Sequence, residues 1–287
     1  MVIGHDSAID CVQNDQYGHY HIDVELESNN IIVTEEVSVI ENELKNVDHT
    51  CLVVFDCDEV LTTIREQICK EQNKKFLIDW CAKNSSPGND ITFFSIADFI
   101  IVTVPNCLVN EKMPLIVEDL YDKGIKSVVL TAFTTKPVSN IEDPLQWRID
   151  TLKKFGYNFE KFWKNLPGCA FSALGRDSHP MYRSGVICCG DVPKSDCLSA
   201  FINHANIHPK KILFIDDNRK NIDDVASFAK EEKIDFVGIE YHEAKKITSG
   251  IPFSEEMAEY QLRTFQEKKV WITDKEAVLS ITHKNVR

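Results

Sequence analysis

We predict from the sequence an α/β protein in which a parallel β-sheet is flanked by helices. Short apolar runs that suit buried strands alternate along the chain with amphipathic helical patterns. Polar residues follow three of these runs directly, as they do at the ligand-binding edge of such sheets. The length of 287 residues allows one large hydrophobic core together with inserted segments.

The first part of the chain, residues 1–44, is predicted to be a polar lead that ends in a short helix over 38–44. Its first thirty or so residues are rich in Asn, Asp, Glu and His. His19 and His21 share one face of an extended segment, as metal ligands can, but no third ligand is near in sequence. We therefore interpret them as part of a surface segment.

The remainder, residues 45–287, is predicted to form the α/β core. Four apolar runs suit strands that are buried on both faces. They are Cys51–Phe55, Lys126–Leu130, Lys211–Ile215 and Asp235–Ile239. Helical patterns alternate with them at Pro114–Tyr121, Lys194–Ala205, Asn221–Lys233 and Glu255–Lys268. This alternation indicates parallel strands joined by crossover helices.

Two segments are too long to be plain loops and are predicted to be inserts. The first, at about 62–112, is expected to be a helical cap. The second, at about 135–190, is expected to contain a helix and a hairpin. Its aromatic-rich stretch from Trp147 to Trp163 is interpreted as the core of the insert, with a substrate pocket as the alternative.

Composition excludes several classes of function. The net charge of −13 argues against nucleic acid as a partner, because phosphate neutralisation needs an excess of Lys and Arg. No apolar run is long enough to span a membrane. The ten cysteines are scattered, without a CxxC pair and without Arg at the spacing of a cysteine phosphatase. Reduced thiols, together with a start that lacks the pattern of a signal peptide, favour a cytoplasmic protein.

Polar residues at three strand ends are expected to converge on one site. Asp56 and Asp58 follow the first strand, Thr131 follows the second, and Asp216–Asp217 follow the third. Ligands of open α/β sheets bind at the carboxyl ends of the strands. The pattern therefore predicts a functional site at that edge of the sheet.

Two carboxylates at a strand end can hydrolyse a phosphate monoester. Asp56 can attack phosphorus and form an aspartyl-phosphate, while Asp58 can protonate the leaving oxygen and later activate water. Lys194, at a predicted helix start, can neutralise the phosphate and Asp56, and Thr131 can offer a hydroxyl. We predict that these four residues are catalytic.

A cation is needed because carboxylates otherwise repel a phosphate. Asp216 and Asp217 supply further oxygen ligands beside Asp56. Oxygen-only ligands favour Mg²⁺, which we predict as the cofactor. Asp217 is also suited to orienting a metal-bound water.

Each of these residues also has a structural interpretation. Asp56 and Asp58 could form a turn, Lys194 could open a helix in solvent, and Thr131 could cap a strand. Their combined order favours the functional interpretation. Asp223–Asp224, by contrast, are predicted to be surface charges on the following helix.

The four positions resemble the motifs of the haloacid dehalogenase (HAD) superfamily. The matching segments are 56–61 (DCDEVL), 130–132 (LTA), Lys194 and 214–218 (FIDDN). The resemblance covers about residues 45–245 and implies a Rossmann-like core with caps, Mg²⁺, and an additional metal ligand from the Asp58 backbone carbonyl. Both carboxylates of the first motif are present, which implies phosphatase or phosphotransferase chemistry rather than dehalogenation.

A narrower similarity concerns the C-terminal part of the chain. Segments 238–241 (GIEY), 259–262 (EYQL) and 271–277 (WITDKEA) are similar to a HAD-like family of intracellular bacteria such as Legionella and chlamydiae. That similarity implies a phosphotyrosine or other phosphoprotein substrate and translocation into a host cell. A small-metabolite phosphatase, a phosphotransferase and an inactive binding module are the alternatives, and the oligomeric state is left open.

Overall fold

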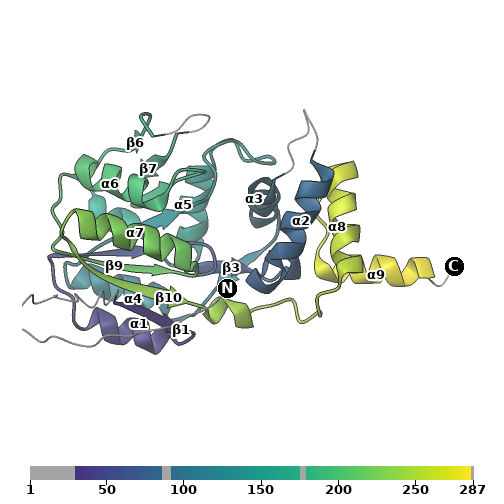
Figure 1. The fold of residues 1–287 in the computed structure, drawn as a ribbon, viewed down its shortest axis with the longest axis horizontal. Helices are drawn as coiled ribbons and strands as arrows, with labels where there is room; N and C mark the ends of the chain where they lie inside the picture. The colour runs from purple at the N-terminus through teal and green to yellow at the C-terminus, as the bar shows by residue number, and fades with distance from the viewer. Residues whose placement is uncertain (1–29, 86–91, 175–178, 286–287) are drawn as a thin grey trace, which may run out of the picture.

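A computed structural model of the chain describes residues 30–85, 92–174 and 179–285, and a mostly parallel β-sheet lies at its centre (Figure 1). Its strands are β1 (Ile31–Thr34), β2 (Cys51–Phe55), β5 (Lys126–Thr131), β6 (Cys169–Ala170), β7 (Met181–Arg183), β8 (Val186–Cys188), β9 (Lys211–Asp216) and β10 (Asp235–Tyr241). They lie in the order β1-β10-β9-β2-β5-β8-β7-β6. The first six strands in this order run parallel to one another, whereas β7 is antiparallel to its neighbours β8 and β6.

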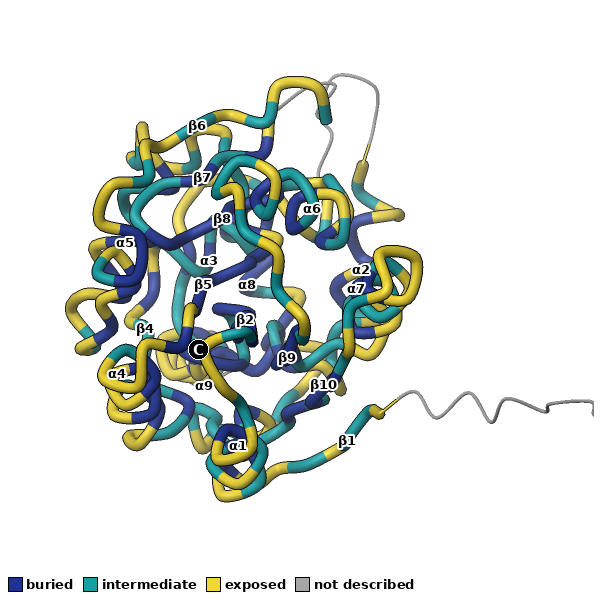
Figure 2. The backbone as a smooth tube through the Cα atoms, turned by 90° about the vertical axis from the view of Figure 1, so that its left-hand side faces the viewer, coloured by how far each residue is buried: buried dark blue, intermediate teal, exposed yellow. Residues whose placement is uncertain are grey.

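The four predicted strands are confirmed as β2, β5, β9 and β10. They are neighbours in the middle of the sheet, and β2 is buried along its whole length. Helices cover both faces of these strands, which explains why their sequences are apolar throughout rather than alternating. In Figure 2 the central strands are accordingly buried, and the surrounding helices turn exposed residues outward.

Helices cover the sheet as the alternating pattern predicts. On one face lie α1 (Val37–Leu44), α4 (Met113–Asp122) and α5 (Pro144–Lys154), and on the other lie α6 (Lys194–Ala205) and α7 (Arg219–Glu231) (Figure 2). Gly124 follows α4 with φ of +71°, a conformation that glycine adopts without strain. The helices are thus observed where they were predicted, and the α/β fold class is confirmed.

Two strands have a place in the sheet that was not predicted. β1 lies within the segment interpreted as a polar lead, yet it pairs in parallel with β10 at the sheet edge. β8 belongs to the hairpin predicted in the second insert, but it also pairs in parallel with β5 and so extends the main sheet. Both strands are only three or four residues long, so neither produces an apolar run that stands out from its surroundings.

The first insert leaves and re-enters the core through a small antiparallel pair, β3 (Thr62–Ile64) and β4 (Asn106–Leu108). Between these strands lie two short 3₁₀ turns, η1 (Gln67–Cys69) and η2 (Glu71–Asn73), and the helices α2 (Lys74–Asn84) and α3 (Phe93–Thr103). The last strand of the sheet is followed by a short turn, η4 (Glu243–Lys246). The chain then forms two C-terminal helices, α8 (Glu255–Lys268) and α9 (Asp274–Asn285).

The helices α2, α3, α8 and α9 form a second body beside the sheet, which we call the cap (Figure 1). The cap has an apolar core of its own, in which Leu77, Ile100 and Leu262 are fully buried. Helix α8 was predicted at its correct position, but the sequence did not indicate that it packs against the first insert.

The second insert contains α5, a 3₁₀ turn η3 (Phe159–Trp163) and the hairpin of β7 and β8. Most of its aromatic side chains are buried in the main core, as interpreted from the sequence; they include Tyr157, Phe159, Phe162 and Trp163. The hairpin turns at Gly185, where φ is +82° and a Cβ atom would lie 2.5 Å from the Phe159 carbonyl oxygen. Glycine is therefore required where this turn packs on η3.

The predicted N-terminal lead, with His19 and His21, lies outside the described residues except for its last part. In the described part of the chain, no helix has both the length and the apolar character needed to cross a bilayer.

Candidate functional site

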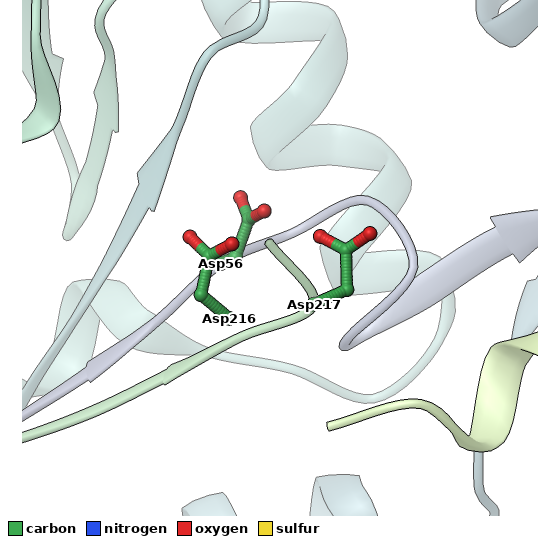
Figure 3. Close-up of side chains that lie close together, drawn as sticks. All are labelled: Asp56, Asp216 and Asp217. Carbon is green, nitrogen blue, oxygen red and sulfur yellow. The ribbon is translucent and has the colours of Figure 1, made fainter. Parts of the chain in front are cut away.

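Three carboxylates from two neighbouring strands meet at the carboxyl edge of the sheet. Asp56 follows β2, Asp216 ends β9, and Asp217 comes next. Each offers an oxygen atom, and these atoms all lie within 4.8 Å of one another. Figure 3 shows the three side chains pointing to the same side of this edge. The predicted convergence of these strand ends is therefore observed.

Lys194 reaches this cluster from the first turn of α6 and is almost completely buried. Its Nζ atom lies 2.8 Å from Asp56 Oδ1 and 2.7 Å from Asp216 Oδ2. Asp216 also accepts hydrogen bonds from two neighbouring residues. The Asn218 backbone N–H and the Asn221 side-chain amide donate to its carboxylate at 2.8–3.2 Å. The alternative of a solvated Lys194 is thus wrong.

Asp224 holds the start of α6, and hence Lys194, in place. Its carboxylate accepts hydrogen bonds from the Ser195 backbone N–H at 3.0 Å and from the Ser195 hydroxyl at 2.9 Å. A carboxylate at a helix N-terminus stabilises the exposed N–H groups there. The prediction of a plain surface charge is wrong for Asp224. It holds for Asp223, which is half-exposed and pairs with Arg219.

The cluster is short of positive charge. Burial raises the pKa of Asp56 to about 7, Lys194 opposes this rise, and the charge of Asp216 adds to it. Burial and the same neighbouring carboxylate hold the pKa of Asp217 well above its usual range. Burial alone would lower the pKa of Lys194, but Asp216 and Asp56 raise it above its usual value, so this lysine is charged.

A divalent cation fits this arrangement. Three carboxylates share one ammonium group, which bridges only Asp56 and Asp216, and Asp217 has no such partner among the described residues. A cation among the three would remove the repulsion that disfavours their ionised forms. Carboxylate oxygens are the donors that Mg²⁺ prefers. Asp56, Asp216 and Asp217 could therefore hold it.

Asp58 lies beside the cluster and is paired with a buried arginine. Arg148 Nη2, from α5, lies 2.9 Å from Asp58 Oδ2, and Thr131 Oγ1 lies 3.4 Å from the same oxygen. The Thr131 hydroxyl also accepts a hydrogen bond from the Phe133 backbone N–H at 3.2 Å. The guanidinium carbon of Arg148 lies 4.1 Å from the centroid of the Phe133 ring, within reach of a cation–π contact.

Sequence reasoning missed Arg148. Its side chain is fully buried, and two of its nitrogen atoms, Nε and Nη1, have no partner among the described residues. The only local signal is that it follows Trp147 in the aromatic-rich stretch; the Trp147 ring lies 5.2 Å from the guanidinium. The interpretation of that stretch as core therefore holds for its later part, while its first part borders the site.

A further ion pair fixes the turn between β2 and β3. Glu59 has a φ of +63°, unusual for a residue with a side chain, and its carboxylate accepts a hydrogen bond from Thr63. Lys70, fully buried, lies 3.2 Å from Glu59 Oε2 and donates to the Thr63 hydroxyl at 2.8 Å. These contacts tie the base of the cap to the segment that carries Asp56 and Asp58.

A pocket of about 160 Å³ opens between the sheet edge and the cap. The sheet side contributes Asp56, Asp58, Glu59, Thr131, Ala132, Phe133 and Asp217, and the first insert contributes Thr63, Ile64, Cys69, Glu71, Lys74, Phe93, Phe94, Ala97, Asp98 and Ile101. The cap therefore covers the carboxylate cluster and builds one wall of its pocket.

Asp98 of α3 is a further acidic group in this pocket that the sequence did not indicate. Burial raises its pKa to about 7, the charge of Asp58 adds to the rise, and Arg148 opposes it. Its position within an apolar helical sequence, FFSIADFIIVT, is the signal that could have identified it. A carboxylate among apolar residues is costly unless it is paired, so an unpaired one in a pocket indicates a functional role.

The thiols near the site are not suited to nucleophilic chemistry. Burial raises the pKa of Cys57 to about 12, and it raises the pKa of Cys69, which lines the pocket, well above its usual value. A thiol of this kind is protonated at neutral pH, whereas the thiolate is the reactive form.

Fold and site together define an α/β protein with a carboxylate-lined pocket between a mostly parallel sheet and a helical cap. The chain belongs to the family described as "Protein of unknown function (DUF2608)", whose model matches residues 33–278. It is also similar to an uncharacterized protein of Rickettsia prowazekii (strain Madrid E). The two are 26% identical over 241 residues, which cover 82% of this chain and 84% of the relative. No solved structure matches the chain significantly.

Proposed function

We propose that this protein is a HAD-like, Mg²⁺-dependent phosphatase that hydrolyses small phosphate monoesters through an aspartyl-phosphate on Asp56. The observation that carries the proposal is the contact of Asp56 with Lys194, 2.8 Å away, beside the carboxylates of Asp216 and Asp217. A nucleophile, a buried cation and a set of hard oxygen ligands are what phosphoryl transfer requires.

The residues have distinct roles in this mechanism. Asp56 attacks phosphorus through the carboxylate oxygen that does not bind Lys194, and Asp58 gives a proton to the departing alcohol oxygen. Asp58 then takes a proton from the water that hydrolyses the aspartyl-phosphate. Lys194 and the Thr131 hydroxyl bind the phosphate oxygens, and Arg148 holds Asp58 in position. Bound Mg²⁺ would neutralise charge on the phosphate.

The pocket favours a small substrate over a phosphoprotein. Ligand pockets for drug-sized molecules usually measure roughly 300–1,000 Å³. The pocket above Asp56 is about 160 Å³, and α3 of the cap supplies part of its wall. A folded protein segment would have to displace the cap, so we favour the small-metabolite phosphatase. A phosphoprotein substrate and translocation into a host cell stay predictions from the resemblance.

The proposal is tested by phosphate release from p-nitrophenyl phosphate. We expect turnover with Mg²⁺, none after chelation with EDTA, and a loss of at least about a thousandfold in Asp56→Asn, since removal of a nucleophile commonly costs this much or more. Asp223→Asn is the matched control, because this aspartate is half-exposed, pairs with Arg219 and does not line the pocket. Equal rates for wild type and Asp56→Asn would sink the proposal and favour a binding module.

A phosphotransferase would use the same intermediate with an alcohol in place of water. Analysis of the products in the presence of added alcohols separates the two activities. If phosphoryl transfer to the alcohol exceeds hydrolysis, the protein is a phosphotransferase rather than a hydrolase, and the proposed role of Asp56 is unchanged.

A further inference from the structure

The cap wall of the pocket carries two aromatic rings. Phe93 and Phe94 line it from α3 together with Ile101, and Phe133 adds a third ring on the sheet side, from the segment after β5. The rings of Phe93 and Phe94 lie edge to face, with centroids 5.4 Å apart. Faces of aromatic rings attract cations, particularly where water is partly excluded.

One ammonium group already lies on this wall. Lys74 Nζ is 5.3 Å from the centroid of the Phe93 ring. The charge of Lys74 is partly balanced by Glu71, which lies 3.4 Å away on the same side of the pocket. The wall therefore accepts an ammonium group in its present geometry.

The carboxylates around the pocket can be compared by their counter-ions. Four of them form ion pairs with a basic side chain. These pairs are Asp56–Lys194, Asp58–Arg148, Glu59–Lys70 and Glu71–Lys74. Asp217 belongs to the three-carboxylate cluster. Asp98 lies outside that cluster, and no hydrogen bond or ion pair joins it to any described residue. It is a carboxylate beside aromatic rings without an ion-pair partner of its own, because Arg148, whose charge it feels, is paired with Asp58.

We propose that the pocket selects phosphate monoesters of amino alcohols, with the substrate's ammonium group held between Asp98 and the rings of Phe93, Phe94 and Phe133. The proposal rests on the proposed phosphatase function and names its substrate class. The ammonium group gives Asp98 a direct ion-pair partner, and the alkyl part of the alcohol packs against Ile101. Anionic leaving groups are disfavoured by Asp98 and Asp58 together.

Three phosphate esters of matched size test the inference. They are 2-aminoethyl phosphate, the neutral propyl phosphate and the anionic carboxymethyl phosphate, each assayed with Mg²⁺. We expect kcat/KM for the aminoethyl ester to exceed that of the propyl ester by at least about tenfold. In Asp98→Asn the ratio of these two values should fall to about 2 or less. The ratio is the readout because it cancels any general effect of the variant on the chemical step.

Asp79→Asn is the matched control, since Asp79 lies on α2 of the cap but outside this pocket, where it pairs with Lys75. It should keep the wild-type preference. A preference for the propyl ester, or a preference for the aminoethyl ester that survives in Asp98→Asn, would overturn the inference. A preference for the carboxymethyl ester would assign recognition to Lys74 instead. Turnover of p-nitrophenyl phosphate in the same preparations tests the phosphatase function separately, and absence of turnover of all four esters would overturn both proposals.

Discussion

Arg148 reaches Asp58 from the interior of the protein. The arginine side chain is fully buried, while the aspartate side chain is 29% exposed. A buried ion pair contributes little net stability, yet removing one partner leaves the other charge uncompensated. The pair therefore acts as a fixed support that sets where the Asp58 carboxylate lies in the pocket.

We expect Arg148→Met to lower the free energy of unfolding by about 1–3 kcal/mol, because it removes a charged hydrogen bond and leaves Asp58 without its partner. Urea unfolding at pH 7 measures the loss. Asp58→Asn combined with Arg148→Met should lose clearly less than the sum of the single variants, since the two residues form one unit. Strictly additive losses would show that the pair is not coupled.

At the scale of single residues, the sequence predicted the groups that follow strands and Lys194 at a helix start, but it missed the groups inside helices. Asp56, Asp58, Thr131 and Asp216–Asp217 were predicted because the carboxyl ends of parallel strands share an edge. Arg148 and Asp98 lie on helices, and only the three-dimensional packing brings them to that edge. Asp224 was misjudged because its partner, Ser195, is 29 positions away in the sequence.

At the scale of elements, the cap is held together by segments from two distant parts of the chain. Leu262 of α8 is fully buried in a cluster with Leu77 of α2 and Ile100 of α3. Periodicity could predict α8 as a helix, because its amphipathic pattern is local. It could not predict the partner of its apolar face, because any apolar stripe fits the pattern equally well.

Leu262→Ala should therefore weaken the cap rather than the sheet. Truncation of a buried leucine costs about 2–5 kcal/mol. We expect faster amide hydrogen exchange in α2 and α3, with exchange in β2 and β9 unchanged. Leu279→Ala on α9 is the control, since this leucine is half-exposed. Equal acceleration in the central strands would mean that the cap and the sheet unfold as one unit.

At the scale of the whole molecule, a buried polar network joins the first insert to the C-terminal segment. Glu66 Oε2 accepts hydrogen bonds from the Trp271 indole at 3.3 Å and from the Asp274 backbone N–H at 3.0 Å. The Asp274 carboxylate accepts in turn from the Gln67 backbone N–H and from the Ser249 hydroxyl. Burial, and then the charge of Asp274, raises the pKa of Glu66 to about 7.

This raised pKa has a defined consequence for stability. The folded protein holds a proton on Glu66 up to about pH 7, whereas the unfolded chain releases it near the ordinary value of 4.5. The contribution of Glu66 to the free energy of unfolding is therefore fully present below about pH 4.5, and it is lost as the pH rises toward 7. Glu66→Gln mimics the protonated side chain and should remove this loss.

Thermal unfolding at pH 5 and pH 8 measures the difference. Between these values we expect the wild type to lose at least about 1 kcal/mol relative to Glu66→Gln, or roughly 2–4 °C in Tm. Comparison with the variant cancels the titration of other groups, among them Asp56. Parallel pH profiles for the two proteins would contradict the assignment.

The two-part cap also sets an order of assembly during synthesis. The last strand of the sheet ends at Tyr241, so every strand has been made before α8 and α9 appear. Until then the apolar faces of α2 and α3 have no cover, and chains grow from the N-terminus at roughly 5–20 residues per second. A nascent chain thus has a complete sheet and a half-built cap, and its pocket takes its final shape only after the C-terminal helices have been released from the ribosome.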